Sequence, residues 1–252
     1  MTNRPDTGEL FGNGVSIKPS VNLQPEVGNN LNLGFIVDRR GLCGLMRVQW
    51  ETNFYYMMMK NMIRLFPADT RSIYTNLGKT RTIGMDTDVK VDVTRNVYLY
   101  FNLTLQDIRD RQRWFNDEQG TSNPTYNKHV PNIPAFYYNY GMEYHAEGLI
   151  GRRELSRVYI DVSHVGEFDW GWQMSSLAEE RRKWRIPSND VFTIGLQQSL
   201  WHNNMSLSLE LENVFNKENY MEFKMPLPGR TLKAKLRFNL FRDKLAGGAM
   251  SL

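Results

Sequence analysis

The sequence has few of the residues that cross-link a fold or build a catalytic centre. Its 252 residues include one cysteine, Cys43, and four histidines. A single cysteine excludes an intramolecular disulfide and argues against a zinc site built on cysteine, so packing and hydrogen bonds must hold the fold together. We predict neither a metal site nor a bound cofactor.

A long hydrophobic run is also missing. The longest stretch without an acidic or basic residue is 191–209, and amide and imidazole side chains interrupt it at Gln197, Gln198, His202, Asn203 and Asn204. A membrane-spanning helix needs about 20 mostly apolar residues, so membrane residence would have to come from strands. Residues 1–10 are polar where a signal peptide needs an apolar core, and the sequence as written predicts no export signal.

Charge of one sign is not concentrated anywhere along the chain. The 31 basic and 27 acidic residues are interspersed and give a formal net charge of +4. Nucleic-acid binding proteins usually gather basic residues on one face, so we expect no nucleic-acid partner. Charged residues make up 23% and hydrophobic residues 41%, which excludes a disordered acidic tail protein.

What the sequence does contain is alternation of apolar and polar residues. From Thr231 to Phe241 the apolar set is Leu232, Ala234, Leu236, Phe238 and Leu240, and the interleaved set is Lys233, Lys235, Arg237 and Asn239. A period of two places the sets on opposite faces of a strand. Residues 205–212 alternate likewise and place Glu210 and Glu212 on the polar face, which suits cross-strand ion pairs with lysines.

Nine such segments predict nine strands of about 9 to 15 residues. They lie near 31–37, 46–56, 83–93, 97–105, 136–145, 155–165, 191–201, 205–211 and 231–241. These strands are long for a soluble sheet but suit a tilted crossing of a bilayer. The sequence thus predicts an all-β fold, an antiparallel up-and-down transmembrane barrel segment.

The connections alternate in length, which supports the membrane interpretation. Short ones are expected at 39–42, 94–96, 146–153 and 202–204, and longer ones at 66–71, 107–133, 172–189 and 222–230. Outer-membrane barrels combine tight periplasmic turns with long extracellular loops. A soluble β-sandwich binding domain or lipocalin-like barrel also alternates, and it stays open as an alternative. A small self-contained outer-membrane barrel is a third possibility.

Several short motifs resemble one family. Residues 211–217 read Leu-Glu-Asn-Val-Phe-Asn-Lys, Tyr220 follows, and residues 226–231 read Pro-Leu-Pro-Gly-Arg-Thr before the final strand that ends at Phe241. This arrangement resembles the C-terminus of TonB-dependent outer-membrane receptors. Upstream, residues 23–26, 53–56 and 132–134 resemble strand openings of the same family. The resemblance covers residues from about 20 to 241.

The resemblance implies about nine strands of a 22-strand barrel whose lumen a plug domain fills. Residues 1–24 would be a polar segment left from an extracellular loop, 25–241 the C-terminal portion of the barrel, and 242–252 a tail. The expected function is active uptake of a large or scarce ligand, namely a siderophore, haem, cobalamin or glycan, from the bacterial outer membrane. The implied partners are outer-membrane lipid and lipopolysaccharide, a small-molecule or oligosaccharide ligand, and the TonB complex, reached through a plug that this chain lacks.

No catalytic motif accompanies these strands, and we predict no enzyme. The histidines lack metalloprotease spacing, no Gly-x-Ser-x-Gly is present, and Gly78-Lys79-Thr80 lacks the first glycine of a phosphate loop. The candidate ligand contacts are aromatic residues in or beside the long loops: Trp114, Phe115 and Trp184. Trp170 and Trp172 are expected to belong to the aromatic girdle at the membrane boundary. The charged run 179–185 is expected to be a solvated or lipopolysaccharide-facing segment.

The alternation also predicts which side chains face which medium. The side chains expected to face lipid are Leu232, Leu236, Phe238, Val97, Leu99 and Phe101. The side chains expected to face the lumen are Lys233, Lys235, Arg237, Glu210 and Glu212.

Overall fold

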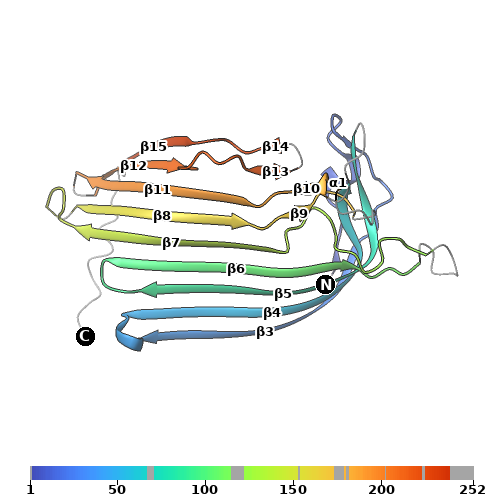
Figure 1. The fold of residues 1–252 in the computed structure, drawn as a ribbon, viewed down its shortest axis with the longest axis horizontal. Helices are drawn as coiled ribbons and strands as arrows, with labels where there is room; N and C mark the ends of the chain where they lie inside the picture. The colour runs from blue at the N-terminus through green and yellow to red at the C-terminus, as the bar shows by residue number, and fades with distance from the viewer. Residues whose placement is uncertain are drawn as a thin grey trace.

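Nine long strands form one curved antiparallel sheet. The computed structural model describes residues 2–66, 71–114, 122–152, 154–172, 179, 182–201, 203–222 and 225–238. Each long strand pairs with the next one along the chain, as the ribbon in Figure 1 shows. In order they are β3 (Glu26–Arg40), β4 (Arg47–Phe66), β5 (Ser72–Asp92), β6 (Val97–Asp110), β7 (Phe136–Glu147), β8 (Leu155–Val165), β11 (Asn189–Leu200), β12 (Met205–Glu212) and β15 (Thr231–Phe238). The predicted all-β, up-and-down architecture is confirmed.

Several short elements accompany the nine long strands. β1 (Thr2–Asn3) pairs with the outer edge of β3, and β2 (Ile17–Lys18) pairs in parallel with β5. Two small hairpins stand apart, β9 (Phe168–Asp169) with β10 (Arg185–Ile186), and β13 (Tyr220–Glu222) with β14 (Met225–Pro226). A one-turn helix α1 (Thr7–Phe11) and a 3-10 turn η1 (Leu42–Gly44) complete the elements, and none of the described helices is long and apolar enough to cross a membrane.

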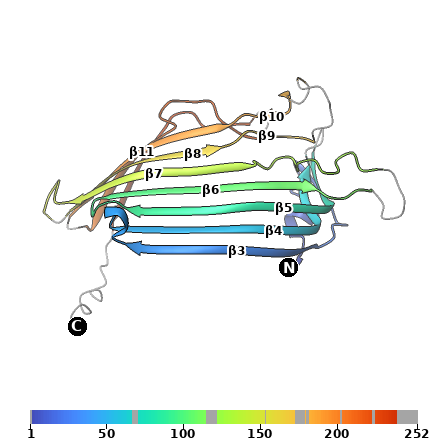
Figure 2. The same cartoon turned by 60° about the horizontal axis from the view of Figure 1, so that its bottom comes forward.

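The sheet has a short-turn end and a long-loop end. The turns between Arg40 and Arg47, Asp92 and Val97, Glu147 and Leu155, and Leu200 and Met205 all lie at the short-turn end (Figure 2). The long-loop end carries the connections 111–135, 166–188 and 213–230. The connection expected at 66–71 lies at residues 67–71, between β4 and β5. The expected strand lengths were wrong here, because β4 and β5 run for 20 and 21 residues rather than the predicted 9 to 15, and their hairpin therefore extends beyond the other strands.

One face of the sheet is apolar and open. Ile160 of β8 is 45% exposed and Leu232 of β15 is 70% exposed, and the residues that share their face include Leu99, Met142, Ile194, Leu196, Leu209, Leu236 and Phe238. The buried hydrophobic residues of the described chain are few: Ile63, Val130, Ala146, Val162 and Ile186. A soluble sandwich would bury this face against a second layer. Because these side chains do not meet each other across a dry interior, the sheet requires an apolar surrounding.

The polar groups of Trp50, Thr52 and Thr87 on the apolar face are satisfied within the protein. The Trp50 indole Nε1–H lies 2.8 Å from Thr52 Oγ1 and 3.0 Å from Thr87 Oγ1, and the two hydroxyls lie 2.6 Å apart. Phe35 packs edge-on against the same indole, with ring centroids 5.0 Å apart. Internal pairing of this kind is what a hydrocarbon environment demands, since no water is present to bind a free hydroxyl.

The opposite face is polar, and hydrogen bonds and ion pairs join its side chains. The phenol of Tyr100 donates to Asp161 at 2.8 Å, and that of Tyr159 donates to Glu210 at 2.5 Å. Cross-strand pairing places Glu210 opposite Lys233, as the sequence predicted for the ion pairs of the last two strands. His145 and Glu143 share this face, with their Nδ1 and Oε1 atoms 3.4 Å apart. The two faces therefore divide the side chains as the alternation predicted.

Candidate functional site

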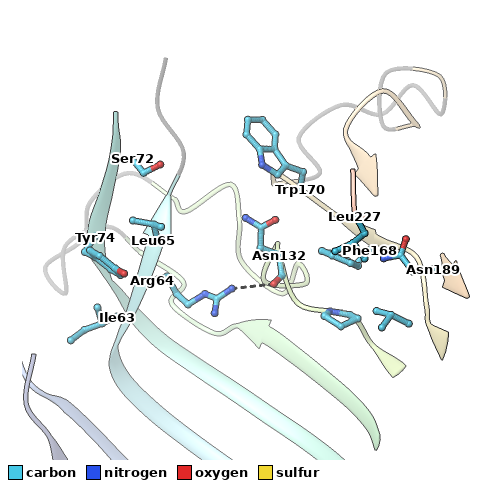
Figure 3. A pocket seen from close by; sticks show the side chains of 12 residues that line it. Ile63, Arg64, Leu65, Ser72, Tyr74, Asn132, Phe168, Trp170, Asn189 and Leu227 are labelled. Atoms are coloured by element: carbon cyan, nitrogen blue, oxygen red, sulfur yellow. Dashed lines mark hydrogen bonds between the residues drawn. The ribbon is translucent and has the colours of Figure 1, made fainter. Parts of the chain in front are cut away.

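A cavity of about 640 Å³ lies at the long-loop end of the sheet. Figure 3 shows side chains from several segments converging on it. The lining residues are Ile63, Arg64 and Leu65 of β4, Ser72 and Tyr74 of β5, Asn132 and Pro134 before β7, Val165 of β8, Phe168 and Trp170, Asn189 of β11, and Leu227. Cavities of this size hold small-molecule ligands.

The far end of the β4–β5 hairpin supplies one wall. Asn61 adopts a positive φ of 58°, which asparagine tolerates better than most residues, and β4 continues past it. Asn76 of β5 holds this bend, because its Nδ2 donates to the Asn61 carbonyl at 2.7 Å and to the Gln24 carbonyl at 2.9 Å. The Gln24 amide in turn donates to Asn76 Oδ1 at 2.8 Å. The N-terminal segment thereby fixes the hairpin that carries Arg64.

Arg64 places a half-buried cation in the cavity. Its Nη2 donates to the carbonyls of Pro131 at 3.1 Å and Asn132 at 3.5 Å. The Arg64 guanidinium is charged at neutral pH, as arginine is throughout proteins. Within the described residues no carboxylate pairs with it. Partial removal of a charge from water is costly without a counter-ion, so the cavity favours an anionic occupant.

Asn132 adds an unsatisfied acceptor. Its backbone takes a positive φ of 58° and its amide donates to the Asp169 carbonyl at 2.8 Å. Its side-chain Oδ1 is buried and has no hydrogen-bond partner among the described residues. Buried polar atoms are normally paired, so this unpaired acceptor on a residue that lines the cavity is a candidate partner for a ligand donor.

Aromatic residues lie at the side of the cavity opposite Arg64. Trp170 and Trp184 stack with ring centroids 5.3 Å apart and planes inclined by 12°, and the Trp170 amide donates to the Trp184 carbonyl at 2.8 Å. Pairing of β9 with β10 holds this stack, and Arg185 supports it through Asp169 at 3.4 Å and Glu167 at 2.8 Å. Arg185, part of the charged run 179–185, therefore makes ion pairs within the protein.

The structure places the three predicted ligand residues differently. Trp184 lies behind the cavity wall, stacked on Trp170. Trp114 is exposed and does not line the cavity; its ring lies 5.6 Å from the Arg113 guanidinium. Phe115 lies outside the described residues. Trp170, expected in the membrane girdle, instead lines the cavity, because the β9–β10 hairpin turns it toward Asn132.

Sequence reasoning missed Arg64 and the acceptor of Asn132. Arg64 stands in the run Met62-Ile-Arg-Leu-Phe66, where a lone charge in an apolar strand was the available signal. The segment 132–134 was noted only as a strand opening. Neither residue's burial follows from the sequence, because their neighbours come from loops distant along the chain.

Comparison with known proteins supports one family. The family model described as TonB dependent receptor-like, beta-barrel, matches residues 2–214. A search of curated proteins found no match. Among solved structures, the copper transporter OprC is 18% identical with a TM-score of 0.66, over 94% of this chain and 35% of that one.

Two further structures are ferric-chelate receptors. The ferric yersiniabactin uptake receptor FyuA from Yersinia pestis is 15% identical with a TM-score of 0.55, over 84% of this chain and 28% of its own. BauA, the ferric preacinetobactin receptor from Acinetobacter baumannii, is 13% identical with a TM-score of 0.60, over 84% and 29%. The chain thus spans about a third of the length of these structures, and at such identities the likeness shows the fold. The chain belongs to the TonB-dependent receptor β-barrel family, whose members are outer-membrane proteins.

Proposed function

We propose that this chain forms the C-terminal wall and part of the mouth of an outer-membrane receptor that imports a scarce ligand, and that the cavity at the long-loop end contacts that ligand. The observation that carries the proposal is Arg64, a half-buried cation without a carboxylate partner in the described residues, opposite the Trp170 ring. In this family the long loops face the cell exterior, where a ligand would arrive.

The lining favours one kind of ligand. A half-buried guanidinium attracts an anion, an aromatic face stacks on a planar group, and the unpaired Asn132 Oδ1 accepts a hydrogen bond. Among siderophores, haem, cobalamin and glycans, planar groups and negative charge are combined in haem, cobalamin and many siderophores, whereas a neutral glycan has neither. Two of the structural neighbours are named as receptors for ferric chelates. We therefore favour a ferric siderophore or haem over a neutral glycan.

The residues of this chain bind and orient the ligand and do no covalent chemistry. Energy would come from the inner membrane through the TonB complex acting on a plug, neither of which is part of the described structure. Trp184 would stiffen Trp170 from behind. Direct ligand contacts by Trp114, Phe115 and Trp184 remain proposals.

The alternative of a small self-contained barrel is less favoured. Such a barrel would pair its first and last strands, but within the described residues β15 pairs with β12 alone and β3 with β1 and β4. A curved open sheet with two unpaired edges instead fits part of a larger cylinder.

The test is ligand binding to receptor extracted from outer membranes, with a ferric catecholate, ferric citrate and haem as probes. Arg64→Met and Trp170→Ala should each weaken binding of at least one probe about tenfold, or about 1.4 kcal/mol. Arg64→Lys should restore part of the loss. Lys235→Gln, on the polar face far from the cavity, is the matched control and should bind as the parent does. Unchanged binding of all three probes in both cavity variants would contradict the proposal.

A further inference from the structure

Met57 and Met59 of β4 place two thioethers on the polar face of the sheet. By alternation they share that face with Asn53 and Tyr55, whereas Met58 lies among the exposed residues of the apolar face. A methionine side chain is apolar, but its sulfur is polarisable and can act as a donor to a metal ion. The pair therefore gives the lumen wall a kind of donor that its carboxylates, amides and hydroxyls do not supply.

Both methionines line one small cavity. Its volume is about 80 Å³, and its other lining residues are Asn3, Glu26, Gly28 and Asn30. Gly28 pairs directly with Met59, and a Cβ atom at position 28 would lie 3.8 Å from Met59 Cγ, so the glycine leaves space beside the thioether. Drug-sized ligands occupy cavities of about 300 to 1,000 Å³. This cavity has room for an ion rather than for a siderophore or haem.

Glu26 gives the cavity a negative charge. Its Oε1 accepts from the Ile63 amide at 2.8 Å, and its Oε2 accepts from Asn3 Nδ2 at 3.1 Å. Both donors are neutral, and within the described residues no lysine, arginine or histidine forms an ion pair with this carboxylate. A half-buried carboxylate without a counter-ion favours a cation beside it.

The donor atoms select the kind of cation. Thioether sulfur is a soft ligand that favours Cu(I), whereas Ca²⁺ and Mg²⁺ take oxygen ligands and Zn²⁺ favours imidazole and thiolate. In the described part of the chain no three histidine, cysteine, aspartate or glutamate residues are placed to hold a metal ion. The predicted absence of a metal site rested on the scarcity of cysteine and histidine, and methionine is a further kind of ligand.

We infer that Met57 and Met59 bind one Cu(I) ion through their sulfur atoms and that Glu26 balances its charge. Side chains two residues apart on a strand start about 7 Å apart on the same face, and the three rotatable bonds of methionine allow both sulfurs to turn toward one ion. The site shares no lining residue with the ligand cavity. Met59 precedes Ile63 by about 13 Å along β4, so the site lies on the short-turn side of that cavity.

The test measures Cu(I) bound to receptor purified from outer membranes in detergent. The protein is first stripped of metal with a chelator and is then titrated with Cu(I), kept reduced by ascorbate, in competition with a chromophoric Cu(I) chelator. X-ray absorption at the copper edge should show sulfur neighbours, and equimolar Zn²⁺ should not displace the bound Cu(I). Copper with oxygen and nitrogen neighbours alone, or its displacement by equimolar Zn²⁺, would overturn the inference. These measurements need no variant, so they hold even where a substitution impairs folding.

Variants then locate the site. M57L/M59L keeps apolar side chains of similar volume and should bind one equivalent of Cu(I) fewer than the parent. M58L/M142L replaces two exposed methionines of the apolar face and is the matched control, which should bind as the parent does. E26Q should weaken Cu(I) binding about tenfold, because it removes the balancing charge.

Heat-modifiable migration in gels confirms that each variant is folded. An unchanged Cu(I) stoichiometry in M57L/M59L, or an equal loss in M58L/M142L, would also overturn the inference. Binding of the ferric and haem probes is a separate readout, so this inference and the proposed function can fail independently.

Discussion

Tyr159 of β8 lies across Gly195 of β11, and a side chain at position 195 would overlap the phenol ring. The same relationship recurs on the polar face between Tyr55 and Gly84 and between Tyr100 and Gly141. Each tyrosine thus covers a glycine of the next strand in the sheet, which locks neighbouring strands in register.

Gly195→Ala should destabilise the sheet. The added methyl group displaces the Tyr159 ring and breaks its 2.5 Å hydrogen bond to Glu210, which should lower the free energy of unfolding by about 1–3 kcal/mol. Urea unfolding of the folded barrel in detergent measures the change. Gly171→Ala, where an added methyl group meets no atom within 4 Å, is the control and should unfold as the parent does.

Arginine on the apolar face should be costly in the middle of the band. Ile160 is aligned across the sheet with Met142 and Ile194, midway along β8. Ile160→Arg should cost about 2–4 kcal/mol in a lipid bilayer. Leu236 is aligned with Leu207 near the short-turn end, so Leu236→Arg should cost less than Ile160→Arg. Ser163→Arg, on the polar face of the same strand, is the matched control, and an equal cost at 160 and 163 would argue against the assigned faces.

The Trp50 indole should stabilise the two hydroxyls that it covers. Trp50→Phe keeps an aromatic ring but removes the donor to Thr52 and Thr87, and we expect a loss of about 1 kcal/mol in the free energy of unfolding. In a T52V/T87V background the same substitution should cost much less, because the acceptors of the indole N–H are already absent. A double-mutant cycle that shows no coupling would refute this role.

Asn219 should anchor the last long loop. It is 1% exposed, it accepts from the Asp190 amide at 3.1 Å, and its Nδ2 donates to the Asp190 carbonyl at 3.0 Å. Asn219→Ala leaves these backbone groups unpaired and should cost about 1–3 kcal/mol. Proteolysis of intact cells should then cut the 213–230 segment faster. Glu218→Ala, a neighbouring exposed position, should leave the cleavage rate unchanged.

The sequence was sufficient to predict the strands but not the cavity. Alternation identifies the two faces of β15 and β12 because burial in a sheet has a strict period of two. The continuation of β4 past Asn61 lacks clear alternation, which explains why the hairpin was expected to be shorter. The β9–β10 pair has two residues in each strand, too few to show any period.

The sequence does not show which distant segments of the chain come together in the fold. Arg64, Asn132 and Trp170 meet in one cavity although they stand far apart along the chain. Their meeting depends on how three loops fold over the end of the sheet, and no local pattern records that. The motif at 211–217, in contrast, signals the family because its asparagines make local bonds: the Asn213 side chain joins both the amide and the carbonyl of Lys217.

Spin labels along β8 give the most direct test of the claim that the apolar face meets lipid. In a C43S background, single labels at residues 158–163 of the receptor in bilayers should show accessibility to oxygen, which dissolves in lipid, at Val158, Ile160 and Val162. Accessibility to a water-soluble nickel chelate should be higher at Tyr159, Asp161 and Ser163. Chelate accessibility without alternation, or with the two sets exchanged, would contradict the account.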